Sequence, residues 1–265
     1  MGTAGILPFM TWLDSIVLGV IEGITEFLPI SSTGHLILAS ELLGLEPSTF
    51  LSSFQIAIQL GAIAAVVALY WKQFLDTQFL TKLFVAFVPT GLVGFLVYPY
   101  VKGLLLGNPM VVVTSLFVGG VVLIVFEIFH KEKPESLEGA KQITYGQALL
   151  VGLFQSIAII PGVSRSAATI IGGLLVGMRR VAIVEFSFLL AVPTMIAATG
   201  YDLLKSADTF AFDDFGLLAL GFVTAFGVAL LSMRFLLAIV RRYTFIPFGI
   251  YRIVLAVLFF LIVLV

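Results

Sequence analysis

The residues of this chain that could do chemistry begin with a pair of carboxylates. Glu22 and Glu26 are spaced i, i+4 within GVIEGITEFLPISS, so in a helix they would share one face. Two like charges this close recruit a cation or share a proton. The pattern therefore predicts a metal-binding or proton-transfer role for the pair. The structural alternative is that one carboxyl stays protonated and bonds a neighbouring helix.

A cluster of hydroxyls and one imidazole follows the carboxylates. Ser31, Ser32 and Thr33 precede Gly34 and His35. A helix amino terminus presents unpaired N–H groups and partial positive charge, which favour phosphate. A Ser beside a His also has the composition of an activated nucleophile. The alternative for Ser31 and Thr33 is an ordinary capping role, whereas packing alone explains His35 poorly.

A second cluster of the same kind lies in the other half of the chain. It contains Pro161, Gly162, Ser164, Arg165, Ser166 and Thr169. Gly permits close approach of the backbone to a ligand, and the planar fork of Arg suits phosphate best. The alternative for Arg165 is that it only neutralises a buried carboxylate, for which the candidates are Glu22, Glu26 and Glu185. We favour both roles, pairing at rest and phosphate binding in use.

Three further charged residues fall within apolar segments, namely Glu127, Arg234 and Arg252. Glu127 lies at the end of an apolar stretch and is expected to reach the membrane interface. The two Arg side chains either do the same or pair internally. We assign none of the three to catalysis.

The composition requires a membrane around these residues. The chain has 265 residues, of which 60% are hydrophobic and 11% charged, and its mean hydropathy is +1.18, far outside the range of soluble domains. The net charge of −1 leaves no basic surface for a nucleic acid. Because the chain has no cysteine, any metal must be held by oxygen or imidazole ligands. We therefore expect an integral membrane protein without nucleic-acid partners.

Six segments are apolar enough to cross a bilayer, which takes roughly 20 residues as a helix. They are residues 50–70, 80–98, 109–129, 181–203, 215–238 and 246–265. Two further apolar regions, 11–44 and 143–178, are interrupted by LPISSTGH at 28–35 and by IPGVSRS at 160–166. Pro ends helices and the following Ser and Thr begin new ones, so each region predicts a re-entrant helical hairpin. Non-helical backbone at membrane depth is tolerated where it lines a wet cavity, which makes both breaks candidate sites.

The chain contains two copies of this arrangement. GVIEGITEFLPISS at 19–32 corresponds to GLFQSIAIIPGVS at 152–164, at an offset near 132. We therefore expect an all-α polytopic membrane protein built as an inverted-topology repeat, in which each half has one re-entrant hairpin and three transmembrane helices. The halves are residues 1–129 and 143–265, and the hydrophilic stretch at 130–142 is the cytoplasmic linker.

Charge gives the expected orientation. Three spans per half is an odd number, so the halves must be inverted. One face collects Lys72, Lys82, Lys131, Lys133, Lys141, Arg179, Arg180, Arg241 and Arg242, and the other has only Lys102 and Lys205, beside Asp202, Asp208, Asp213 and Asp214. Because Lys and Arg concentrate on the cytoplasmic side, we expect both termini and the opening of the site on the periplasmic side. The two breaks would meet near the midplane.

The segments EGITEFLPISSTGH and PGVSRSAAT resemble the two signatures of the undecaprenyl-diphosphatase family, the bacitracin-resistance type of membrane phosphatase, and the similarity extends over the full chain. The first signature is matched throughout, and the second has Ala167 where Gly is common. The resemblance implies hydrolysis of undecaprenyl diphosphate to the monophosphate, which recycles the lipid carrier for peptidoglycan at the outer face of the bacterial inner membrane. It also implies a divalent cation, Mg²⁺ or Ca²⁺, which Glu26 would hold with the help of Glu22.

The two motifs together give the expected site. The predicted catalytic residues are Glu26, Ser32, His35 and Arg165, and the predicted phosphate-binding residues are Ser31, Thr33, Gly162, Ser164, Arg165, Ser166 and Thr169. Ser32 is the preferred nucleophile and His35 its base, which then serves as the acid at the leaving oxygen. Glu26 orients His35 or holds the metal. Attack by water, with Glu26 or His35 as base, is the alternative.

The rival function is a transporter or flippase of polyprenyl phosphate lipids, because inverted repeats with broken helices are a transporter architecture. The combination of Glu, Ser, His and Arg is more reactive than binding alone requires, which favours the phosphatase. The expected partners are a polyprenyl diphosphate lipid and membrane lipids, and the sequence is compatible with a homodimer.

Overall fold

The computed structural model describes residues 10–100, 108–132, 136, 139–206 and 215–264, and these residues form an all-helical fold. Several charges used to predict the orientation lie outside the described part: Lys102, Lys133, Asp208, Asp213, Asp214, and the side chains of Asp202 and Lys205. Part of the predicted linker at 130–142 also lies outside it.

Five helices of the described residues are long and apolar enough to cross a membrane. They are α3 (Thr49–Tyr70) with the 3-10 turn η1 (Trp71–Leu75), α4 (Thr77–Tyr100), α5 (Pro109–Phe129), α8 (Arg180–Ser206) and α9 (Phe215–Val240). The sixth predicted span forms α10 (Ile246–Phe259) and the π-helical turn η6 (Phe260–Leu264). This segment is apolar, but its described part is shorter than the other five. Five of the six predicted spans are therefore confirmed as helices of spanning length.

The two interrupted regions each form a pair of short helices. In the first half these are α1 (Trp12–Thr25) and α2 (Ser32–Leu42). In the second half they are α6 (Tyr145–Ser156), extended by the 3-10 turn η4 (Ile157–Ile159), and α7 (Arg165–Leu175); a further turn, η3 (Ala140–Gln142), precedes α6. Both breaks are where the sequence predicts them, although helix resumes inside the polar runs. α2 and α7 have 11 residues each, too few to cross a hydrocarbon core of about 30 Å.

The same capping signal begins α1 and α6. Thr11 forms a capping box with Asp14, and Thr144 forms one with Gln147. Each box satisfies N–H groups that the first turn of a helix leaves without partners. The two boxes lie 133 residues apart in the sequence. The short helix pairs therefore start from the same local chemistry in both halves.

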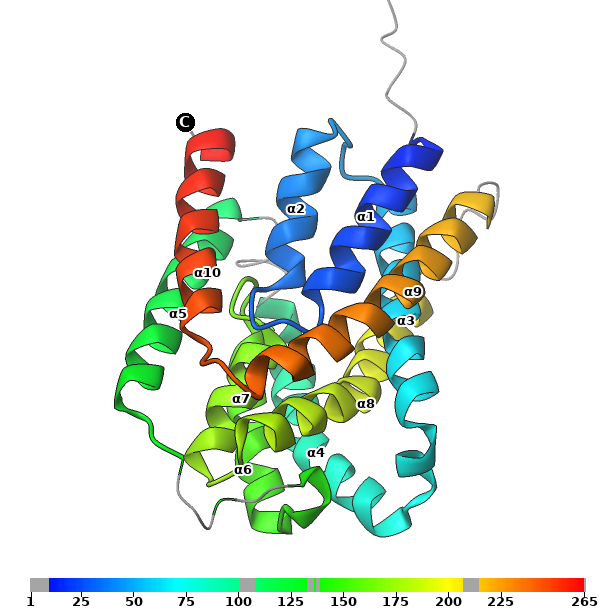
Figure 1. The fold of residues 1–265 in the computed structure, drawn as a ribbon. Helices are drawn as coiled ribbons and strands as arrows, with labels where there is room; N and C mark the ends of the chain where they lie inside the picture. The colour runs from blue at the N-terminus through cyan, green and yellow to red at the C-terminus, as the bar shows by residue number, and fades with distance from the viewer. Residues whose placement is uncertain (1–9, 101–107, 133–135, 137–138, 207–214, 265) are drawn as a thin grey trace, which may run out of the picture.

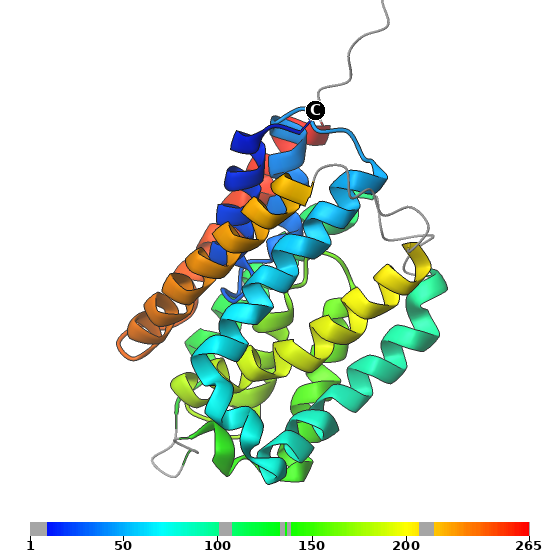
Figure 2. The ribbon, with the colours of Figure 1, turned by 90° about the vertical axis from the view of Figure 1, so that its right-hand side faces the viewer.

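The helices pack crosswise between the two halves of the chain. α1 packs mainly on α9, and α6 packs mainly on α4, so a long helix of one half supports the short pair of the other (Figure 1). α5 of the first half also packs on α10 of the second half. Figure 2 shows α8 running between α3 and α4. This exchange brings the two breaks toward each other in the middle of the molecule.

Glu127, which was expected near the membrane interface, lies near the end of α5 and is buried between helices, with only 5% of the residue exposed. Its carboxylate accepts from Arg180 Nη2 at 2.6 Å, from Arg180 Nε at 3.2 Å and from the amide of Phe245 at 3.2 Å. These bonds join α5, α8 and the start of α10. Pairing with Arg180 and the bond from the Phe245 amide offset the cost of removing the Glu127 charge from water. Arg252 is also buried, whereas Arg234 is exposed on α9.

Gly152 allows α6 to approach α4 closely. A methyl group at this position would collide with the carbonyl oxygen of Ala86, whereas one at Gly146 of the same helix would meet nothing within 4 Å. We expect Gly152→Ala to lower the free energy of unfolding by about 1–3 kcal/mol through overpacking. Gly146→Ala should leave it unchanged or raise it by up to about 1 kcal/mol.

Thermal unfolding of both variants and the wild type in detergent checks this prediction. Gly146→Ala is the matched control, since it makes the same chemical change on the same helix. Equal unfolding midpoints for the two variants would contradict the close packing of α6 on α4.

Candidate active site

The two breaks meet in the interior, where side chains of both halves bond one another. Ser166 Oγ donates to the carbonyl of Leu28 at 2.7 Å. Arg165 Nη2 donates to Glu26 Oε1 at 2.9 Å, and only 11% of the Arg165 side chain and 6% of the Glu26 side chain are exposed. The structure thus brings together a carboxylate and a guanidinium that belong to separate motifs in the sequence.

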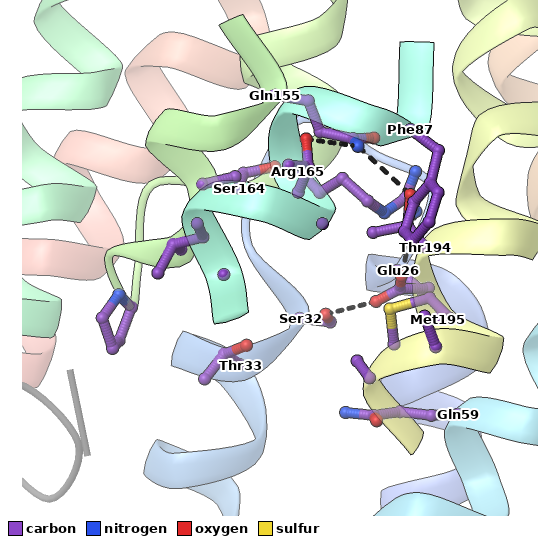
Figure 3. A pocket seen from close by; sticks show the side chains of 18 of the residues that line it. Glu26, Ser32, Thr33, Gln59, Phe87, Gln155, Ser164, Arg165, Thr194 and Met195 are labelled. Atoms are coloured by element: carbon purple, nitrogen blue, oxygen red, sulfur yellow. Dashed lines mark hydrogen bonds and ion pairs between the residues drawn. The ribbon is translucent and has the colours of Figure 1, made fainter. Parts of the chain in front are cut away.

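Glu26 is the centre of this arrangement. Its Oε2 accepts from Ser32 Oγ at 2.6 Å while its Oε1 binds Arg165 (Figure 3). Arg165 Nη1 also donates to the carbonyl of Ser187 at 3.0 Å. Among the carboxylates considered as partners for Arg165, the structure pairs it with Glu26. A buried charge is tolerated when it is paired and hydrogen-bonded, and here the pairing also places a hydroxyl and a guanidinium on one carboxylate.

Two serines in a strained backbone conformation lead the chain into α2 and α7. Ser31 has φ 70° and Ser164 has φ 77°, and they are the only non-glycine residues of the described chain with positive φ. Their hydroxyls accept from the amides of Gly34 at 3.4 Å and Ala167 at 3.3 Å. A residue in this region costs about 1–3 kcal/mol, and such strain clusters at functional sites because the surrounding structure must impose it.

A cavity of about 490 Å³ lies against the two breaks. Its polar lining consists of Glu26, Ser31, Ser32, Thr33, Gln59, Thr90, Gln155, Gly162, Ser164, Arg165, Thr194 and Tyr201. Its apolar walls include Phe87, Gly91, Gly94 and Phe95 of α4, Met195, Ala197 and Ala198 of α8, and Ala158, Ile159 and Pro161 beside the second break. Figure 3 shows how Ser32, Arg165 and Gln155 surround this space together with Glu26. The cavity is amphipathic, as expected for a ligand with a polar head and an apolar tail.

Two of the predicted phosphate-binding hydroxyls, those of Thr169 and Ser166, bond neighbouring segments of the scaffold. Thr169 Oγ1 lies 2.7 Å from Ser187 Oγ and donates toward the carbonyls of Arg165 and Ser166, both at 3.0 Å. Ser166 is the residue that bonds the first break. Neither Thr169 nor Ser166 lines the cavity. The structure therefore places them behind the site, where they hold the start of α7.

Gln155 is a cavity residue that the sequence motifs do not include. It is 1% exposed, and its Nε2 donates to Thr90 Oγ1 at 2.9 Å and to Thr194 Oγ1 at 3.1 Å. Each threonine hydroxyl donates its own hydrogen to a backbone carbonyl, those of Gly152 and Leu190. Both hydroxyls must therefore accept from Gln155, which fixes the orientation of its amide. Gln155 Oε1 is left as a buried acceptor without a protein partner.

Comparison with known proteins places the chain in a family. The model of the family described as "Bacitracin resistance protein BacA" matches residues 15–258. The undecaprenyl-diphosphatase of Persephonella marina is 52% identical over 253 residues, which cover 95% of this chain and 99% of the relative. The undecaprenyl-diphosphatase of Sulfurihydrogenibium sp. is 50% identical over 252 residues, with the same coverage of both chains. That of Aquifex aeolicus is 47% identical over 251 residues, covering 94% of this chain and 98% of the relative.

The chain belongs to the BacA family. This membership confirms the resemblance that the two motifs carry. Both breaks and the cavity between them fall inside the matched range, so the similarity covers the candidate site as well as the scaffold. With five apolar helices of spanning length, this BacA-family chain is a multi-pass membrane protein.

His35 of this BacA-family chain does not bond Ser32. Its Nδ1 lies 2.7 Å from the carbonyl oxygen of Ser31, which can only accept, so Nδ1 carries the proton. Its Nε2 lies 2.8 Å from the hydroxyl of Tyr251, and the two rings are stacked. The expected pair of Ser32 and His35 is therefore replaced by Ser32 and Glu26, because the imidazole is drawn one turn back along α2 and toward α10. His35 does not line the cavity.

The fit of a divalent cation to the BacA-family site depends on Glu22. Within the described residues, no three acidic or histidine side chains converge. Glu22 is fully buried, and both of its carboxylate oxygens lack a hydrogen-bond partner. Two unpartnered hard oxygens one turn from Glu26 are ligands that Mg²⁺ and Ca²⁺ prefer, and a cation would compensate a buried carboxylate that is otherwise unpaired. The residues fit a cation whose remaining ligands come from a substrate or water.

The ion pair of Glu26 and Arg165 gives a prediction for stability. We expect Arg165→Met to lower the free energy of unfolding by about 3–5 kcal/mol, because it leaves the Glu26 charge buried without its partner. The double variant Glu26→Gln/Arg165→Met should be more stable than Arg165→Met alone, since both charges are then removed. Thermal unfolding in detergent compares the stability of the wild type, Arg165→Met and the double variant. A double variant less stable than Arg165→Met would contradict the pairing.

Proposed function

We propose that this chain hydrolyses undecaprenyl diphosphate to undecaprenyl phosphate and inorganic phosphate, so that the lipid carrier is recycled for peptidoglycan synthesis and bacitracin is resisted. The observation that carries the proposal is the bonding of Glu26 to both Ser32 and Arg165 at the polar end of an apolar-walled cavity. An acceptor, a hydroxyl and a guanidinium in contact are the groups that phosphoryl transfer requires.

The cavity suits both ends of such a lipid. Arg165 and the hydroxyls of Ser31 and Ser32 line its polar end, where charge-assisted bonds to a diphosphate can form. Its walls on α4 and α8 are apolar, and Phe95 on α4 is 75% exposed. The apolar wall therefore continues onto the outer surface of the helices. A hydrocarbon tail would leave the cavity between α4 and α8 and enter the bilayer.

In the proposed reaction, Ser32 Oγ attacks the terminal phosphorus of the diphosphate. Its proton passes to Glu26 Oε2, with which it already shares a hydrogen bond of 2.6 Å. The bond between that phosphorus and the bridging oxygen breaks, and undecaprenyl phosphate leaves. The proton on Glu26 passes to the leaving phosphate, which restores the carboxylate. Water then attacks the phosphorus of the phosphoserine and gives a proton to Glu26, the bond between phosphorus and Ser32 Oγ breaks, and this proton returns to Ser32 Oγ as inorganic phosphate leaves. Direct attack by a water that Glu26 activates is the alternative, and it uses the same acceptor.

In the proposed reaction, substrate binding to Arg165 frees the Glu26 carboxylate from its ion pair with Arg165. At rest, its guanidinium neutralises the carboxylate at 2.9 Å. A bound diphosphate presents more negative charge and competes for the same donors, so Glu26 becomes available to accept the proton of Ser32. The guanidinium then stabilises the charge that develops on the transferred phosphoryl group.

A divalent cation, Mg²⁺ or Ca²⁺, is part of the proposal. Glu22 and Glu26 would hold it, and it would supply neutralisation of the phosphate charge. The two carboxylates are one helical turn apart on α1 and its C-terminal end.

The finer architecture belongs to the proposal as well. We infer two inverted repeats, each with one re-entrant hairpin, in a bacterial inner membrane with the site open to the periplasm. The capping signals 133 residues apart and the exchanged packing of α1 on α9 and α6 on α4 support the repeat. The concentration of Lys and Arg on one face supports the orientation. The homodimer that the sequence allows stays a prediction.

Transport of the monophosphate lipid is the function that the test below must separate from hydrolysis. The names of the relatives favour hydrolysis. The detergent-purified protein is given a long-chain isoprenyl diphosphate with Mg²⁺, and inorganic phosphate is measured. We expect the wild type to release phosphate and removal of the divalent cation by a chelator to stop the reaction. If no phosphate is released with Mg²⁺ or Ca²⁺ present, the proposed hydrolysis is wrong and transport of the lipid becomes the favoured function.

The variants in the same assay separate the roles of the site residues. Glu26→Gln and Arg165→Ala should each lower kcat/KM by at least about 100-fold, because proton transfer and charge stabilisation each contribute this much. Ser32→Ala should do the same if Ser32 is the nucleophile, whereas attack by water predicts that it retains much of the activity. Acid trapping of a phosphorylated Ser32 in the wild type decides between the two mechanisms.

His35 gives a separate prediction, because its Nδ1–H bonds the Ser31 carbonyl within the strained turn. Asn carries an N–H donor at a similar position, so His35→Asn should keep kcat within about fivefold of the wild type, while His35→Ala should lose more than about tenfold. A general base would instead cost about 10²–10⁴ in both variants. Equal, large losses in the two variants would return the role of base to His35.

A further inference from the structure

Arg252 of α10 lies fully buried behind the two breaks and contacts neither the cavity nor a carboxylate. It is 0% exposed, is not among the residues that line the cavity, and takes part in no salt bridge that the described residues form. A buried guanidinium without a counter-ion is costly unless other groups satisfy its donors. The acceptors of the Arg252 guanidinium therefore indicate its structural role.

All five donors of the Arg252 guanidinium are used, and every acceptor is a backbone carbonyl. Nη1 donates to Val163 at 2.9 Å and Pro29 at 3.3 Å, Nη2 donates to Gly162 at 2.9 Å and Ser115 at 3.0 Å, and Nε donates to Leu116 at 3.4 Å. A guanidinium has five N–H groups in a fixed plane. The side chain therefore imposes the geometry of that plane on the carbonyls that surround it.

The carbonyls come from the two segments that build the site and from one helix beside them. Pro29 belongs to the first break, Gly162 and Val163 belong to the second, and Ser115 and Leu116 belong to α5. Among the described residues, no backbone N–H bonds the carbonyls of Pro29, Gly162 and Val163, and lipid cannot supply a donor. Arg252 satisfies carbonyls from both breaks at once, so it fixes their separation.

The same bonds orient the peptide that enters α7. The C=O and N–H of a trans peptide point in opposite directions. Because the Val163 carbonyl is held on Arg252, the N–H of Ser164 is aimed away from Arg252. Ser164 lines the cavity and has the strained φ of 77°. The bond from Arg252 to the Val163 carbonyl thus fixes the orientation of a peptide group next to Ser164, which lines the cavity.

We propose that Arg252 is a positioning residue, which holds the two breaks in register so that Ser32 and Glu26 of one meet Arg165 of the other. The proposal rests on the phosphatase function proposed above. Loss of the constraint should lower kcat more than it changes KM, because a misplacement of about 1 Å in reacting groups can cost 100-fold in rate.

Gly119 of α5 allows this constraint to be tested without deleting the arginine. A methyl group at Gly119 would lie 2.8 Å from Arg252 Cζ and closer still to Nη2. Gly119→Ala therefore displaces the guanidinium while all of its carbonyl acceptors remain. Gly227→Ala on α9 is the matched control, because a methyl group there meets nothing within 4 Å.

The first readout is a double-mutant cycle on phosphate release by the purified, monodisperse proteins. We expect Gly119→Ala to lower kcat by about 10–100-fold with KM changed by less than about threefold, and Gly227→Ala to match the wild type. In an Arg252→Met background, Gly119→Ala should cause little further loss, because the group it displaces is gone. If Arg252→Met yields no folded protein, Arg252→Lys takes its place. Wild-type kcat in Gly119→Ala, or the same loss in both backgrounds, would overturn the proposal.

The second readout does not depend on activity. The chain has no cysteine, so Leu42→Cys on α2 and Leu175→Cys on α7, both at exposed positions, can carry spin labels alone. We expect the distance distribution between the labels to broaden or shift in Gly119→Ala and to stay unchanged in Gly227→Ala. An unchanged distribution in Gly119→Ala refutes the positioning role. An inactive wild type whose distances respond in this way refutes the phosphatase function alone.

Discussion

The structure depends on one constraint, which is that backbone polar groups inside a membrane must find partners within the protein. Each break exposes carbonyl and N–H groups that a continuous helix would satisfy. Arg252 takes carbonyls of both breaks, and Ser166 takes the carbonyl of Leu28. Ser31 and Ser164 satisfy amides at the starts of α2 and α7. Satisfying these groups locks two irregular segments together, and the locked segments form the wall of the cavity.

The buried charged side chains also find partners within the protein, and Glu22 is the exception. Glu26 is paired with Arg165, Glu127 is paired with Arg180, and the charge of Arg252 is distributed over carbonyls. Glu22 has no such compensation, because both of its oxygens lack partners. A carboxylate in that state is stabilised by a proton or by a cation. The proposed function assigns a cation to this position, because Glu22 lies one helical turn before Glu26.

Sequence motifs predicted which residues gather at the site better than they predicted which residues bond one another. The two breaks, Glu26 and Arg165 follow from polar residues in an apolar chain, since such residues are too costly to bury without purpose. The pairing of Ser32 with Glu26 does not follow, because proximity in sequence favours His35. Gln155 lies in the repeated segment at 152–164, 133 residues after Glu22, the spacing that separates Ser31 from Ser164, but it was missed because it belongs to neither polar break. Comparing the two halves position by position is the signal that could have found it.

The sequence by itself determined the membrane environment, the helical class, the position of both breaks and the chemistry collected in them, because hydropathy, proline and capping residues act locally. Only the tertiary structure decided that His35 bonds the Ser31 carbonyl and Tyr251, that Thr169 and Ser166 lie outside the cavity lining, and that Arg252 bonds carbonyls of both breaks. These outcomes depend on which helix of one half packs on which helix of the other. A side chain on α10 meets carbonyls far away in sequence only after the two halves have exchanged their contacts, and no local pattern encodes that meeting.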